Sequence, residues 1–198
     1  DSALETIDLI NLPSNIPRLL SSHFWRVEDL LANDFMNLLK LLLVCELKFG
    51  HETFFLRSLM RSIRNRETIE MIWQIILKTL GESLNQENIK ETWRKFNFFH
   101  LAASGTAEFF EFLLEEAPLT PSDKVELLMS DYEQGNILVT ARDNFDFESI
   151  YELVAKHLRH EQMSSLLSYE KQSNKFYFIQ LLAKHHKFLQ GFNLHGIF

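Results

Sequence analysis

Glycine, proline and cysteine are all scarce in this sequence, and each shortage argues against a class of structure. The 198 residues include 6 glycines, 4 prolines and 1 cysteine. So few glycines and prolines disfavour a turn-rich β-sandwich and favour helices. A single cysteine, Cys45, cannot form a disulfide within the chain, which favours a reducing compartment. We therefore expect an intracellular protein, in the cytoplasm or the nucleus.

The sequence also lacks a long apolar run and a net positive charge. The longest apolar run spans only residues 41–45, whereas a membrane helix needs roughly 20 apolar residues. The net charge of −7 repels nucleic acid and anionic membranes, so we expect neither as a partner. The composition is otherwise typical of a globular protein, because 46% of the residues are hydrophobic and 18 of these are Phe. This composition predicts one domain whose core is built from aromatic side chains.

A short helix opener recurs along the chain. Residues 97–103, NFFHLAA, resemble residues 136–142, which lie 39 residues later, and residues 175–181, which lie another 39 residues on. A further copy, at residues 53–59, precedes the first by 44 residues. Two equal intervals in succession are difficult to obtain by chance, and they indicate a repeated structural unit.

The segments around each opener repeat as well. A polar turn precedes each opener, and a second amphipathic helix is expected after it, over residues 68–80, 106–117 and 147–158. Thr106 can cap one of these helices, and Pro118 can end it. An additional half-helix follows near residues 122–130, with Ser122 as its expected cap. One such unit cannot bury its own apolar face, so neighbouring units must stack.

These motifs resemble those of the ankyrin-repeat family, in a degenerate, long-period form. The matching residues are Asp131–Asn136 (DYEQGN), His100–Gly105 (HLAASG) and the F-x-x-L-L helix at Phe109–Leu114. The T-P-L-H tetrapeptide of the family is nowhere intact, and Leu56, Val139 and Phe178 stand where His100 would recur. The resemblance implies that His100 serves its turn as a structural group.

The resemblance implies an all-α solenoid of about four helix-turn-helix units, with short turns in place of full β-hairpins. Residues 1–46 would form a helical cap or a degenerate first repeat. Residues 47–198 would form the array, with units starting near residues 47, 94, 131 and 170. The longer first interval implies an insertion within residues 81–93. A HEAT or armadillo array has a similar period and is the alternative architecture; the Gly-Asn turns favour the ankyrin-like one.

No motif in the chain predicts catalysis, and we expect a protein that is not an enzyme and has no cofactor or metal. His157 and His160 do not form a zincin motif, and adjacent His185 and His186 point to different sides of a helix. Cys45 lies among apolar residues, which indicates a buried side chain. Carboxylates such as Asp146 and the pair Glu115-Glu116 are typical of loop and helix surfaces.

One group of basic residues predicts a binding site. Arg57, Arg61 and Arg64 recur at i, i+4 and i+7 on the first helix of their unit. In ankyrin-like stacking, first helices and turn tips line the concave surface that meets partners. Three guanidinium groups there would bind carboxylates or phosphate. The alternative is a solvated face partly neutralised by Glu52 and Glu67.

The turn tips supply the remaining candidate residues. An exposed aromatic ring such as Phe96 or Tyr132 would anchor a partner, unless these rings pack on the next turn. The complete set of tip candidates is Phe49, His51, Lys95, Phe96, Tyr132, Gln134, Lys171 and Gln172.

Together these patterns predict a protein-interaction scaffold within a larger protein, which binds a protein partner with an acidic surface. The alternative is a structural spacer or self-association segment that positions a catalytic domain outside this fragment, for example in a host-directed effector of the kind the family resemblance implies.

Overall fold

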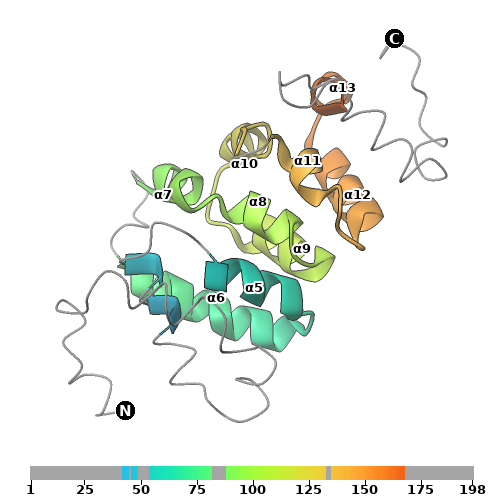
Figure 1. Cartoon of the computed structure of the whole chain (residues 1–198). Helices are drawn as coiled ribbons and strands as arrows, with labels where there is room; N and C mark the ends of the chain where they lie inside the picture. The colour runs from blue at the N-terminus through green and yellow to red at the C-terminus, as the bar shows by residue number, and fades with distance from the viewer. Residues whose placement is uncertain (1–41, 45, 49–53, 82–87, 133–134, 168–198) are drawn as a thin grey trace, which may run out of the picture.

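The computed structural model describes residues 42–44, 46–48, 54–81, 88–132 and 135–167, and this part of the chain is all-helical, as the composition predicts (Figure 1). Within these ranges no residue belongs to a strand. In the same ranges, extended pairing is limited to an isolated bridge, in which Tyr132 and Gly135 exchange two backbone hydrogen bonds of 3.0 and 2.9 Å. No helix of the described part is long and apolar enough to cross a membrane.

The helices that the structure describes between residues 54 and 167 follow one another in three groups of three. The first group is α5 (Phe54–Ser62), α6 (Arg66–Leu80) and α7 (Ile89–Phe96). The second is α8 (Phe98–Ala103), α9 (Ala107–Glu116) and α10 (Pro121–Leu128). The third is α11 (Ile137–Ala141), α12 (Phe147–His157) and α13 (His160–Leu167). Residues 42–44 and 46–48 are also helical.

The first helix of each group begins where the repeated openers predict. Helices α5, α8 and α11 start at Phe54, Phe98 and Ile137, each one residue into its opener. Asn136 fixes the last of these starts, because its side chain accepts hydrogen bonds from the N–H groups of Leu138 and Val139. The recurring sequence therefore marks a recurring helix start.

The caps of the later helices are partly those expected. Thr106 caps α9 by accepting a hydrogen bond from the N–H of Phe109, as predicted. The cap of α10 is not Ser122 but Thr120, which accepts from the N–H of Asp123. Pro121 occupies the first helical position, where its fixed φ and missing N–H favour a helix start, so the cap must precede it.

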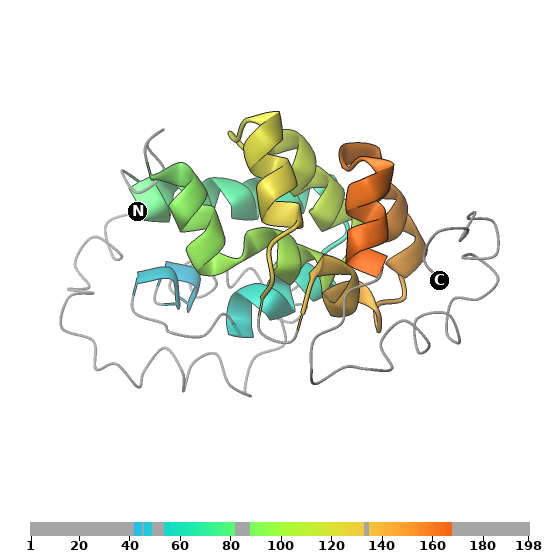
Figure 2. The same ribbon diagram turned by 90° about the horizontal axis from the view of Figure 1, so that it is seen from above.

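Equivalent helices of neighbouring groups pack against each other. α8 contacts both α5 and α11, α9 contacts both α6 and α12, and α10 contacts α7. Seen from above, α5, α8 and α11 lie along one side, and α6 and α9 lie on the opposite side (Figure 2). Two helical layers thus run through the three groups.

Aromatic side chains fill the core, as the abundance of Phe predicts. In the first and second groups, the side chains of Trp73, Trp93 and Phe98 are at most 2% exposed, and their ring centroids lie 5.2 to 5.7 Å apart. Each ring pair meets edge to face, the geometry that aligns a ring edge with a π face. Ala102 and Ala103 are fully buried in α8, between α5 and α11. Their small side chains permit the close approach of those helices.

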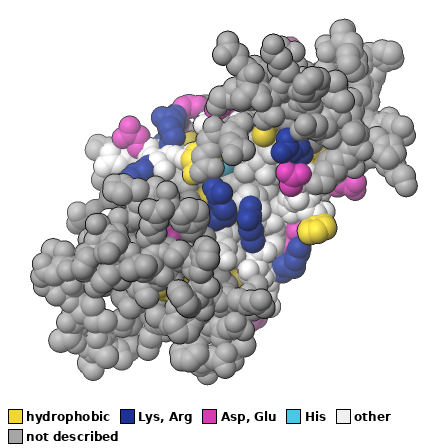
Figure 3. Space-filling view, viewed as in Figure 1, with side chains coloured by type: hydrophobic (Ala, Val, Ile, Leu, Met, Phe, Trp, Pro, Cys, Tyr) yellow, Lys and Arg dark blue, Asp and Glu magenta, His cyan; other side chains and the backbone are white. Residues whose placement is uncertain are grey.

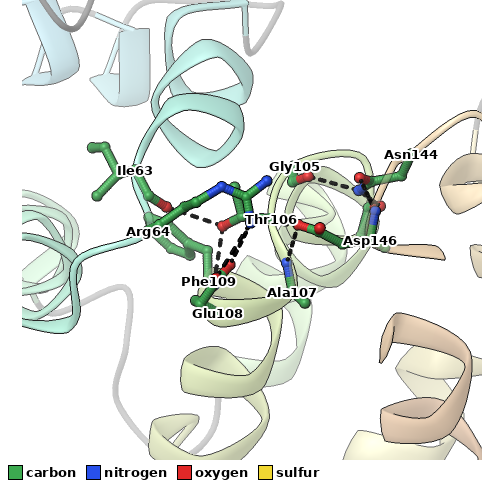
Figure 4. Close-up of polar contacts among 10 residues, drawn as sticks. Ile63, Arg64, Gly105, Thr106, Ala107, Glu108, Phe109, Asn144 and Asp146 are labelled. Carbon is green, nitrogen blue, oxygen red and sulfur yellow. Dashed lines mark hydrogen bonds and ion pairs between the residues drawn. The ribbon is translucent and has the colours of Figure 1, made fainter. Parts of the chain in front are cut away.

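The connections between first and second helices form a set of contacts that we call the loop ladder: residues 63–65, 104–106 and 144–146 (Figure 4). The Thr106 hydroxyl, fully buried, donates to the carbonyl of Ile63 at 3.0 Å. The Asn144 amide donates to the carbonyl of Gly105 at 2.6 Å, and Asp146 accepts from the N–H of Ala107 at 3.2 Å. Asp146 is therefore not an ordinary loop charge, because it binds the preceding group.

Gly105 allows the first two loops to approach so closely. A Cβ atom at this position would lie 2.3 Å from the carbonyl oxygen of Met60 at the end of α5. No side chain of any size fits there without moving backbone. The glycine before Thr106 is thus required by packing between groups.

Candidate interaction surface

Of the candidate residues that the structure describes, Arg57 and Arg61 lie on α5, on the side of the molecule that carries α5, α8 and α11. Figure 3 shows this side, where Lys and Arg side chains gather over the first helices. Helix α5 contributes two cations, Arg57 and Arg61. Arg61 is exposed, and Arg57 is half-buried.

Arg57 and Arg61 lie one helical turn apart. Burial lowers the pKa of the Arg61 guanidinium, and the positive charge of Arg57 lowers it further. Arg61 Nε donates to the carbonyl of Ser104 at 3.0 Å, which uses one of its five N–H groups. Two positive charges thus lie one turn apart on α5, and Arg57 also lies near the Glu46 carboxyl group.

Arg64, the third arginine of the predicted stripe, lies elsewhere and has a different role. Helix α5 ends at Ser62, so Arg64 belongs to the loop ladder. Its guanidinium contacts Asp146 at 2.8 Å and Glu108 at 3.1 Å, and the hydrogen bond that it donates to Asp146 raises its pKa. These carboxylates, and not Glu67, neutralise it. Arg64 thus joins all three helix groups (Figure 4).

A buried carboxylate lies at the other end of α5. Glu46, 4% exposed, accepts hydrogen bonds from the N–H groups of Phe55 and Leu56 at 2.6 and 2.7 Å. Burial raises the pKa of Glu46 to about 7, although both hydrogen bonds and the charge of Arg57 act in the opposite direction. The sequence shows no sign of this cap, because capping patterns are local and Glu46 stands nine residues before Phe55.

The aromatic turn-tip residues that the structure describes, Phe96 and Tyr132, are not exposed, whereas an anchoring ring must be. Phe96 is only 7% exposed, and its ring packs 5.6 Å from that of Phe98. Tyr132 is half-buried, with its ring edge to face with that of His100 at 5.7 Å. Lys95 is exposed, with its ammonium 5.4 Å from the centre of the Phe96 ring.

The remaining tip candidates and several chemical candidates lie outside the described residues. These are Phe49, His51, Gln134, Lys171, Gln172 and Cys45, together with His185 and His186. Of the histidines that the structure does describe, His100 is buried, and His157 Nδ1 lies 2.9 Å from the carbonyl of Leu153 in its own helix. The described ranges contain no group of three or more His, Cys, Asp or Glu that could hold a metal ion.

Phe145 is an exposed aromatic residue that no sequence pattern singles out. Its side chain is fully exposed, whereas the other large hydrophobic side chains of the described part are not. Its neighbour Asn144 binds the loop 104–106 and its neighbour Asp146 binds the first residue of α9, so the backbone beneath the ring is held in place. The Phe-rich composition indicates a core and contains no signal for one ring that faces solvent.

Arg61 and the Phe145 loop bind the same short segment. Arg61 donates to the carbonyl of Ser104, and Asn144 donates to the carbonyl of the next residue, Gly105. The loop 104–106 therefore contacts the Arg61 side chain of the first group and Asn144 of the third group, which is next to Phe145 in the chain. We call Arg57, Arg61 and Phe145 the first-helix surface.

Comparisons with the profiles of known families, with curated proteins and with solved structures find no match for this chain.

Proposed function

We propose that this chain is a protein-interaction scaffold that binds an acidic protein partner through its first-helix surface. The observation that carries the proposal is the placement of two guanidinium groups, Arg57 and Arg61, one helical turn apart on α5, with the Arg61 side chain exposed. Guanidinium groups bind carboxylates through paired N–H donors, so an acidic segment fits this position. Phe145 adds the exposed aromatic ring that interface anchors commonly use.

The architecture we propose is an ankyrin-like solenoid. Its support is the succession of three-helix groups, in which first helices pack on first helices and second helices on second helices. Each group leaves an equivalent surface exposed, and stacking makes these surfaces continuous, which is how solenoids present extended binding faces. The short bridge at Tyr132 and Gly135 fits a turn in place of a full hairpin.

The experiment compares captured partners between matched variants. The chain is used as bait, as wild type, as Arg57→Glu/Arg61→Glu, and as Lys156→Glu/Arg159→Glu, which changes the charge equally at exposed positions of the third group. We expect acidic proteins to be retained by the wild type and the control and lost with the first variant. Retention should also weaken with added salt. Equal capture by all three baits would contradict the proposal.

The alternative function is a spacer or self-association segment, and light scattering tests it separately. A chain that forms dimers or larger species on its own, and retains no heterologous protein, would support this alternative. The Arg57→Glu/Arg61→Glu variant then shows whether the same face is used. A monomeric wild type would argue against self-association.

A further inference from the structure

We draw no further inference here: the strongest candidate, the exposed Phe145 ring on the loop between α11 and α12, already belongs to the first-helix surface, and nothing in the structure shows what covers it.

Discussion

Two sets of contacts join neighbouring helix groups, and their chemistry differs. The loop ladder contains the Arg64 ion pairs and, in addition, hydrogen bonds of hydroxyl, amide and backbone groups, such as the one that the fully buried Thr106 hydroxyl donates to the carbonyl of Ile63. The third helices are joined by side-chain ion pairs, in which Lys90 of α7 contacts Asp123 and Glu126 of α10. Those side chains remain 27 to 51% exposed. Buried hydrogen bonds are costly to lose, whereas water and salt replace exposed ion pairs.

This difference predicts that the stability of the stack resides in the loop ladder. The third-helix ion pairs can vary with little consequence for folding. The ladder should instead be sensitive to the loss of a single hydroxyl or the gain of a single methyl group. Variants in each set, with controls of similar chemistry, separate the two contributions.

The largest effect is expected from Gly105→Ala. The added methyl group would lie 2.3 Å from the Met60 carbonyl oxygen, so backbone must move, at a cost of about 3 kcal/mol in the free energy of unfolding. The control, Gly81→Ala, has no neighbour within 4 Å, so its cost of about 1 to 2 kcal/mol comes only from the backbone strain of φ +47° and ψ −121°. Urea denaturation measures both. Equal losses would show that the loops are not in close contact.

The second effect concerns the charged cap at the other end of α5. The pKa of Glu46 is about 7 in the folded protein and 4.5 for an unperturbed glutamate, so the folded state binds the extra proton between these values. Stability from this group is therefore complete below pH 4.5 and is lost as the pH rises through 7, by about 3 kcal/mol in total. No hydroxyl or amide of the ladder titrates in this range.

Glu46→Gln isolates that contribution, because glutamine keeps an acceptor for the α5 N–H groups and does not titrate. The free energy of unfolding of the variant, measured from about pH 4.5 to 8, should fall less steeply than that of the wild type. Parallel pH profiles for the two proteins would exclude a raised Glu46 pKa.

The third effect separates a ladder contact from an ordinary cap. Thr106 and Thr120 both cap helices, but only Thr106 also donates to another helix group. Thr106→Val should cost about 2 kcal/mol and Thr120→Val about 1 kcal/mol of unfolding free energy. Chemical denaturation of the two variants provides the comparison. A loss with Thr120→Val as large as with Thr106→Val would mean that the ladder bond adds nothing.

Local signals in the sequence predict much of this fold. The openers mark the starts of α8 and α11, and Thr106 and Pro118 delimit α9, because caps and helix breakers act over a few residues. Ser122 is the wrong cap for α10. Proline favours the first helical turn, so Pro121 itself points to the residue before it, Thr120, as the cap.

The candidate surface is less predictable because its contacts are distant in sequence. Arg64 donates a hydrogen bond to Asp146, which lies 82 residues later in the chain. Arg61 donates one to the carbonyl of Ser104, which lies 43 residues later. Helical spacing alone groups Arg64 with Arg57 and Arg61, and it contains no information on those partners. Phe96 and Phe145 illustrate the same limit. Both stand next to polar residues, yet one ring is buried and the other is fully exposed.

The smallest effect is expected at the third helices, and it tests the comparison most directly. Lys90→Gln/Glu126→Gln removes the α7–α10 pair without changing net charge, and glutamine preserves most of the side-chain length. Since these groups are exposed in the folded protein, water replaces their contacts, and the urea midpoint should stay within experimental error of the wild type. About 0.5 M salt shortens the Debye length to about 4 Å and screens this ion pair. The difference in urea midpoint between wild type and variant should therefore stay within experimental error at that salt concentration as well. A clear loss in the variant would mean that the third helices join the groups as strongly as the ladder does.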